Sequence, residues 1–211
     1  MPANPGFQLS LDVKGRVCIV IGGDEEAADK VNRLLEAGAK VTVVSPTLND
    51  ALRKLTASAK VIHRGRLFRS TDIEGASLVI NTVRGDPDQS KLLYELATKE
   101  RVLLCTTDQP RYSTAMLPAL ASRGHLRCAI STSGVAPALA SRLRQDLEEL
   151  FDDEFAAFLE RLAAVREQTG ESVADPEQRR AMLLEAVDGF KLTGHIQYPK
   201  AWVEQGSRQT G

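Results

Sequence analysis

The sequence predicts an α/β protein in which helices cover both faces of a parallel β-sheet. Over the first half of the chain, short apolar, β-branched runs alternate with amphipathic segments through short connections. The first run ends at a glycine pair, and a helical pattern begins directly after it. Beyond residue 112 this alternation stops. Together these observations indicate a Rossmann-like sheet followed by a small segment and a C-terminal helical segment.

Five runs are expected to form the sheet. Residues 16–21 begin with Arg16 and are otherwise apolar, as is typical of a strand buried on both faces, and they stop at Gly22-Gly23. Residues 40–44 stop at Ser45-Pro46. The other expected strands are residues 60–63, 77–82 and 101–106. Because helical segments connect them, the strands are expected to be parallel, with right-handed crossovers.

The segments between the strands have helical periodicity. From Glu25 the apolar residues fall on one helical face, acids occupy the first turn, and Gly38 stands near the end. A short helix is expected at residues 51–58. Asp86-Pro87 begins another helix, which runs to about Glu100.

The second half of the chain has a different pattern. Residues 113–133 predict two short strands outside the parallel sheet, and Pro137 begins a helix with leucines at helical spacing. Two further helices are expected at about 152–168 and 177–190, and the residues from Thr193 onward predict a loosely held tail. We therefore divide the chain into residues 1–112, 113–150 and 151–211.

Charge and apolar content exclude several classes of protein. The 27 basic and 28 acidic residues give no excess that would favour nucleic acid or a membrane surface. The apolar runs are too short to cross a bilayer, and no secretory signal is recognisable. The three cysteines lie in apolar runs and are expected as core residues, while the three histidines are too scattered for a metal site. We expect a cytoplasmic protein.

The glycine pair marks a candidate dinucleotide site. A strand that runs into Gly22-Gly23 and then a helix N-terminus is where a Rossmann protein holds a pyrophosphate. Gly22 and the small Ala27 fit this fingerprint, but Asp24 stands where a glycine is wanted. A carboxylate about 4 Å from a phosphate oxygen repels it by roughly 1 kcal/mol in water and about 4 kcal/mol at an effective dielectric constant near 20, which is about one to three orders of magnitude in affinity. Ordinary helix-start chemistry would explain this acid equally well.

Three segments resemble the precorrin-2 dehydrogenase/sirohydrochlorin ferrochelatase family, which also forms the N-terminal part of bifunctional siroheme synthases. They are LDVKGRVCIVIGG at 11–23, LLEAGAKVTVVSP at 34–46 and AISTSGVAPALASRLRQDLE at 129–148. The third is the most specific, because Ile-Ser-Thr-x-Gly-x-x-Pro-x-Leu-Ala is unusual after a Rossmann domain. The resemblance covers about residues 9–150.

The resemblance implies an activity and an assembly. It implies oxidation of the tetrapyrrole precorrin-2 to sirohydrochlorin with NAD as hydride acceptor and, in some members, insertion of iron to give siroheme. It also implies an intertwined homodimer, with dimer contacts from residues 113–150 and a helical tail beside the active-site cleft.

The resemblance also implies site residues. It places the catalytic acid at Asp108, just after the fifth strand, where a carboxylate can take a proton as hydride leaves; a turn residue before Pro110 is the alternative. The candidates for binding the tetrapyrrole carboxylates are Ser131, Thr132, Ser133 and Gly134. The same stretch would serve as an ordinary helix cap. The candidates for dinucleotide binding are Gly22, Gly23, Asp24, Glu25, Glu26, Ser45, Pro46, Thr47, Thr82 and Val83. The arginines that could supply cations to the substrate are Arg111, Arg123, Arg127, Arg142 and Arg144.

The chain departs from the family pattern at the dinucleotide site. Asp24, Glu26 and Asp29 replace glycine, valine and arginine. Residues 81–85 read Asn-Thr-Val-Arg-Gly where Ala-Ala-Thr followed by acidic or amide residues is usual. Two alternatives therefore stay open: a chelatase or tetrapyrrole-binding protein without redox activity, and a nucleotide-sensing module of another class.

Overall fold

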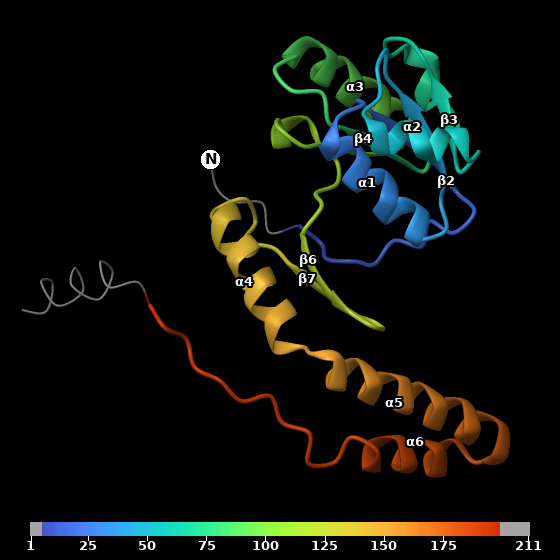
Figure 1. Ribbon diagram of the computed structural model, residues 1–211, viewed down its shortest axis with the longest axis vertical. Helices are drawn as coiled ribbons and strands as arrows, with labels where there is room; N and C mark the ends of the chain where they lie inside the picture. The colour runs from blue at the N-terminus through green and yellow to red at the C-terminus, as the bar shows by residue number, and fades with distance from the viewer. Residues whose placement is uncertain (1–5, 199–211) are drawn as a thin grey trace, which may run out of the picture. The chain divides into compact units, whose positions relative to one another are not determined.

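A computed structural model describes residues 6–198 of the protein. Within this range the chain forms two compact units (Figure 1). The first unit contains residues 6–119 and 130–141, and the second contains residues 120–129 and 142–198.

The first unit is built on a five-stranded parallel sheet in the order β3-β2-β1-β4-β5. Its strands are β1 (Val17–Ile21), β2 (Lys40–Val44), β3 (Val61–Arg64), β4 (Leu78–Asn81) and β5 (Leu103–Thr106). The order reverses at β1, which pairs with β2 on one side and with β4 on the other. This confirms the Rossmann-like α/β fold expected from the apolar runs.

Three α-helices return the chain between the strands, and each begins at a capping side chain. Asp24 caps α1 (Glu25–Glu36), Asn49 caps α2 (Asp50–Ala57), and Asp86 caps α3 (Pro87–Glu100). In each case the side-chain oxygen accepts a hydrogen bond from a backbone N–H in the first turn, which has no partner inside the helix. Two 3-10 helices, η1 (Ser70–Ile73) and η2 (Pro110–Tyr112), complete the unit.

The core lies in two layers, one on each face of the sheet. Alternate side chains of a strand point to opposite faces, so Cys18 and Val20 pack with α1 and α2, whereas Ile19 and Ile21 pack with α3 and η1. β1 therefore buries four of its five residues, as its apolar sequence predicts. This rigid central strand ends at Gly22-Gly23, where the candidate site begins.

From Ala119 to residue 198 the described chain contains a two-stranded sheet and three helices. The strands are β6 (Ala119–Arg123) and β7 (Leu126–Ile130), and the helices are α4 (Pro137–Leu150), α5 (Asp153–Ser172) and α6 (Pro176–Glu185). The two strands outside the parallel sheet are as expected. α5 is longer than predicted, and it continues through Gly170.

The predicted end of the last helix, at residue 190, is wrong. After Glu185 the chain forms turns with hydrogen bonds between residues i and i+3. The N–H of Asp188 donates to the carbonyl of Glu185, and that of Phe190 donates to the carbonyl of Val187. Gly189 has a φ of 76°, in the left-handed region that ends helices. Residues 193–198 have no regular structure, and the rest of the predicted tail lies outside the described residues.

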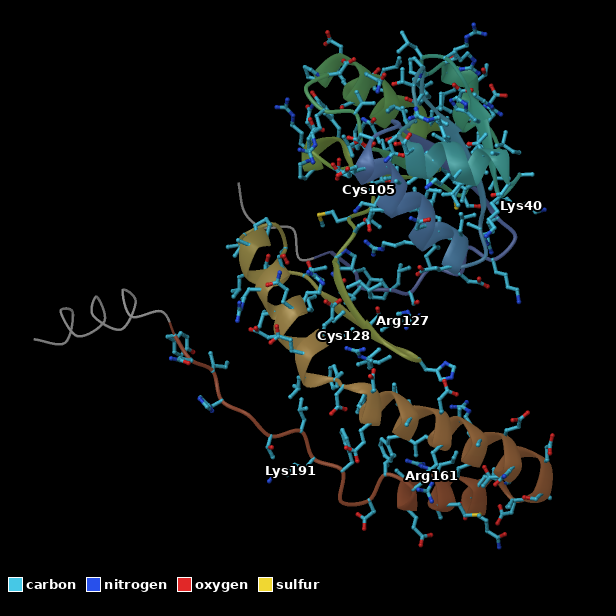
Figure 2. All side chains as sticks on the ribbon, in the orientation of Figure 1. Lys40, Cys105, Arg127, Cys128, Arg161 and Lys191 are labelled. Carbon is cyan, nitrogen blue, oxygen red and sulfur yellow. The ribbon has the colours of Figure 1, made fainter. Side chains whose placement is uncertain are left out.

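The cysteines are free thiols with different surroundings. Cys18 and Cys105 are buried, as expected, whereas Cys128 on β7 is only partly buried (Figure 2). Burial raises the pKa of both the Cys18 and the Cys105 thiols, so neither is primed as a nucleophile. Within residues 6–198, none of the helices combines the length and apolar character that a membrane crossing requires.

Candidate functional site

A cleft of about 380 Å³ lies at the carboxyl ends of β1, β2 and β4. Because the strand order reverses at β1, the loops that follow β2 and β4 flank the glycine loop from opposite sides. The residues that line the cleft are Gly22, Gly23, Asp24, Ser45, Thr47, Leu48, Asn49, Thr82, Val83 and Arg84. In an open α/β sheet this is the place for a nucleotide.

Both glycines are required by the close approach of the flanking loops. Gly22 has a φ of 125°, and a Cβ there would lie 2.1 Å from Oγ1 of Thr82. A Cβ on Gly23 would lie 1.9 Å from the carbonyl oxygen of Thr47 and 2.7 Å from Oγ of Ser45. The Gly23 carbonyl also accepts a hydrogen bond of 2.7 Å from the N–H of Asn49. The glycine loop and the loop after β2 therefore form one packed wall of the cleft.

Asp24 acts as the N-cap of α1. Its Oδ1 accepts a hydrogen bond of 2.9 Å from the N–H of Ala27, and its carbonyl accepts one of 3.0 Å from the N–H of Ala28. The carboxylate thus occupies one of the helix N–H groups that a phosphate would use, while it also lines the cleft. The helix-start interpretation of Asp24 is correct, and its charge nevertheless faces the candidate ligand site.

Most of the residues expected to bind a dinucleotide line the cleft, and three do not. Glu25, Glu26 and Pro46 lie outside its lining. Glu26 instead accepts hydrogen bonds from Arg84, which lines the cleft and was not among the expected residues. Its place in the chain, three residues after the end of β4, is the signal in the sequence that could have included it.

Asp108 lies in the loop after β5, and its carboxylate is held by the loop after β4. Its Oδ2 accepts a hydrogen bond of 3.0 Å from the N–H of Gly85, next to Arg84. The N-cap position of η2 belongs to Gln109, so Asp108 does not cap that turn. Asp108 is exposed, whereas Oγ1 of Thr107 and Oε1 of Gln109 are buried without a hydrogen-bond partner in the described chain. Asp108 is therefore an accessible carboxylate outside the cleft lining, bonded to the residue that follows Arg84.

The stretch from Ser131 to Gly134 forms a tight turn before α4. The N–H of Ser133 donates to Oγ of Ser131 at 3.1 Å, and the N–H of Ala136 donates to Oγ1 of Thr132 at 3.2 Å. Ser133 and Gly134 have φ values of 53° and 79°. Each hydroxyl oxygen thus accepts a local backbone bond, as in an ordinary turn, and its O–H can still donate outward.

Two family models match the chain. One, described as putative NAD(P)-binding, covers residues 9–119, and one described as sirohaem biosynthesis protein central covers residues 123–150. The chain belongs to the family of the first model, which is described as putative NAD(P)-binding, and its residues 123–150 match the central segment of sirohaem biosynthesis proteins. Among curated siroheme synthase relatives, that of Methylobacillus flagellatus is 32% identical over 172 residues, which are 82% of this chain and 37% of that protein. Siroheme synthase 2 of Halorhodospira halophila is 34% identical over 148 residues, which are 68% of this chain and 29% of that protein. The chain thus spans less than half the length of these curated relatives.

A solved structure has the same fold as this chain. The structure described as SirC, precorrin-2 dehydrogenase, has a TM-score of 0.70 at 23% sequence identity, over 87% of this chain and 90% of that one. At this identity the likeness concerns the fold, including the helical segments that follow the Rossmann-like sheet.

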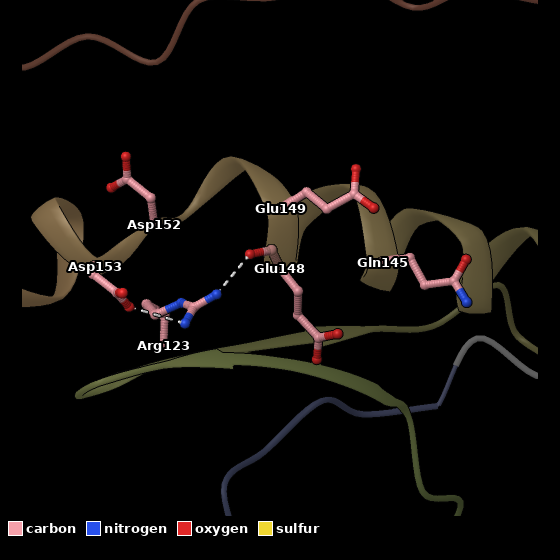
Figure 3. A pocket seen from close by; sticks show the side chains of 6 residues that line it. All are labelled: Arg123, Gln145, Glu148, Glu149, Asp152 and Asp153. Atoms are coloured by element: carbon pink, nitrogen blue, oxygen red, sulfur yellow. Dashed lines mark hydrogen bonds and ion pairs between the residues drawn. The ribbon is translucent and has the colours of Figure 1, made fainter.

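Within the second unit, Arg123 on β6 links that strand to the end of α4 and the start of α5. Its Nε donates to the carbonyl of Phe151 at 2.6 Å and its Nη2 to the carbonyl of Glu148 at 3.0 Å, while its Nη1 lies 3.2 Å from Oδ1 of Asp153 (Figure 3). The Glu148 carbonyl belongs to the last turn of α4, where carbonyls lack helical partners, and Phe151 follows the helix directly. The surrounding hollow of about 390 Å³ is lined by Arg123, Gln145, Glu148, Glu149, Asp152 and Asp153. This acidic hollow is suited to joining α4 to α5, not to binding an acidic tetrapyrrole.

The other arginines considered for the substrate also have local partners. Arg127 donates to the carbonyl of Gly124 at 2.6 Å, and Figure 2 shows it on the β7 strand. Arg142 and Arg144 pair with acids one turn further along α4, Asp146 and Glu148. The guanidinium of Arg111 lies 4.8 Å from the ring centre of Tyr112, without an acidic partner in the described ion pairs.

Proposed function

We propose that this protein oxidises precorrin-2 to sirohydrochlorin with NAD as the hydride acceptor, in the cytoplasm. The supporting observation is that one chain combines two features. It has a cleft beside β1, where the strand order of the Rossmann-like sheet reverses, and it has the segment that matches the central part of sirohaem biosynthesis proteins. The activity is proposed for this chain alone, since the curated relatives are more than twice as long.

The cleft has the features that a dinucleotide requires. Gly22 and Gly23 leave no room for a Cβ, so backbone forms the floor beside the start of α1. Bound NAD+ would supply the hydride acceptor. We assign to Thr82, Val83 and the 45–49 loop the positioning of the dinucleotide between the two walls.

We assign proton transfer to Asp108. Precorrin-2 must lose a hydride and a proton to become sirohydrochlorin, with NADH and H+ as the other products. The exposed carboxylate of Asp108 can accept that proton, and its bond to the N–H of Gly85 fixes it at the edge of the cleft. Ser131 and Thr132 are assigned to the substrate carboxylates through hydroxyl groups that can still donate.

Asp24 favours one second function. A carboxylate that lines the cleft repels a pyrophosphate, so a member of this family could retain tetrapyrrole binding or iron insertion while it loses the redox step. In that case Asp108 would take protons from pyrrole nitrogens during metal entry.

We further propose that the protein is a homodimer. Leu139 and Leu143 lie one turn apart on α4 and are 53% and 41% exposed, and the nearby Val135 is 74% exposed. A second copy of the chain would cover this apolar face. Light scattering should give twice the monomer mass, and Leu139→Glu with Leu143→Glu should halve it; a monomeric native chain would contradict the proposal.

The test of the proposed function is a calorimetric titration of NAD+ into the native protein and into Asp24→Gly. Micromolar binding by the native protein, with anaerobic NADH formation from precorrin-2 that Asp108→Asn abolishes, supports the dehydrogenase. Binding by Asp24→Gly alone, with no NADH formation by the native protein, supports the second function. Glycine is tolerated at a helix N-cap at a cost of only a few tenths of a kcal/mol, so the variant should fold.

A further inference from the structure

Arg84 is the single cationic side chain among the described residues that line the dinucleotide cleft. It follows Thr82 and Val83 in the loop after β4, on the wall opposite the 45–49 loop. Its side chain is 71% exposed, so its guanidinium group is free to reorient. Asp24, the only carboxylate in that lining, stands at the glycine loop between the two walls.

The present partner of Arg84 is a partly buried carboxylate. Nη2 and Nε of Arg84 lie 2.6 Å and 3.2 Å from Oε2 of Glu26, whose side chain is 22% exposed. The pKa of Arg84 is raised, first by the hydrogen bond to Glu26 and then by the charges of Glu26, Asp24 and Asp108. Arg84 is the exposed partner of this pair, so its guanidinium group remains hydrated and can exchange Glu26 for another anion at little cost to itself.

A pyrophosphate is a better partner than Glu26 for this guanidinium. An arginine presents paired N–H donors that match two phosphate oxygens, and the dinucleotide brings negative charge into a cleft that already holds Asp24. Without a cation at this wall, the repulsion from Asp24 would be unopposed. Within the cleft lining, Arg84 and Asp24 are therefore opposite in charge.

We propose that Arg84 leaves Glu26 and binds the pyrophosphate of the dinucleotide. The inference rests on the proposed dinucleotide function and deepens it. It makes the loop after β4 part of the phosphate site, in addition to the glycine loop and the start of α1.

The test is a set of titrations with NAD+, ADP and adenosine. Arg84→Ala should bind NAD+ and ADP about ten- to a hundredfold more weakly than the native protein, because it loses charge-assisted hydrogen bonds to phosphate, and adenosine binding should not change. The matched control is Arg16→Ala, which removes an exposed arginine at the amino end of β1 and should alter binding less than about twofold. Glu26→Gln, which frees Arg84 from its present partner, should tighten NAD+ binding up to about fivefold.

A double-mutant cycle separates direct contact from neutralisation of Asp24. If Arg84 binds phosphate, Arg84→Ala must still weaken NAD+ binding in the Asp24→Asn background. A loss that disappears in that background means that Arg84 only offsets Asp24, and it overturns the proposal. NAD+ binding by the native protein that survives Arg84→Ala overturns this inference alone. Absence of NAD+ and ADP binding by both the native protein and Asp24→Asn overturns the dinucleotide function as well.

Discussion

Gly23→Ala is expected to destabilise the first unit for a purely steric reason. A Cβ at this position would lie 1.9 Å from the carbonyl oxygen of Thr47, whereas real Cβ atoms essentially never approach closer than 3.0 Å. The φ of Gly23 lies outside the left-handed region, so backbone strain at the residue itself does not contribute. The Thr47 carbonyl must therefore move by about 1 Å, and it belongs to the backbone that leads to the cap of α2 at Asn49.

The expected cost is at the upper end of the range for overpacking, about 3 kcal/mol in the free energy of unfolding. For a chain of this size the midpoint of thermal unfolding should fall by roughly 6–12 °C. Gly65→Ala is the matched control in the same unit, because its Cβ would meet only His63 at an ordinary 3.5 Å. Circular dichroism melts and urea titrations of both variants measure the difference. If Gly23→Ala is as stable as Gly65→Ala, the packed wall between the glycine loop and the 45–49 loop does not exist as described.

Three further substitutions test other contacts. Asp72→Asn should lower the free energy of unfolding by on the order of 3 kcal/mol near pH 7, because the carboxylate is 1% exposed and accepts bonds from Arg64 and Arg66. These bonds, led by that of Arg66, lower the pKa of Asp72. The stabilisation by the Asp72 carboxylate is therefore complete above about pH 4 and is lost as the pH falls below that. A urea titration near pH 3 should give a smaller difference between Asp72→Asn and the native protein, and an undiminished difference would refute the assignment. Arg123→Ala should cost about 2 kcal/mol in urea titrations of the helical signal, more than Arg123→Lys, since it removes the bonds to the α4 carbonyls. Asp24→Ala should cost about 1 kcal/mol by losing the helix cap, whereas Asp24→Asn keeps the cap and should unfold like the native protein.

The parallel sheet was predictable because its strands are buried on both faces. Continuous apolar runs such as residues 16–21 have few alternatives in a chain of this size, and the glycine pair after them marked the switch point. The end of the last helix was not predictable from periodicity. Apolar residues continue at helical spacing to Phe190. The helix nevertheless ends at Glu185, because turns with hydrogen bonds between residues i and i+3 follow it and Gly189 is left-handed.

The candidate site was predictable only in part, since its walls come from separate loops. Gly22, Gly23 and Asp24 are contiguous with β1, so their place follows from the strand itself. The place of Arg84 depends on the pairing of β4 beside β1, and an exposed arginine carries no sign of that neighbour in the sequence. Glu26 was expected in the cleft, but it follows the helical turn of α1 away from it and meets Arg84 outside.

The pairing of β1 with β4 also bears on the order in which the protein folds. Oγ1 of Thr82 donates to the carbonyl of Ile21 across 61 positions of the chain, whereas Arg123 reaches Phe151 across 28. Closing a longer loop costs more chain entropy, and distant pairings form more slowly than local ones. The contact of Arg123 with Phe151 is therefore expected to form before β1 pairs with β4. The cleft is lined by residues that follow β1 and β4. Nucleotide binding is therefore expected to appear late in folding, and its appearance would indicate that β1 and β4 have paired.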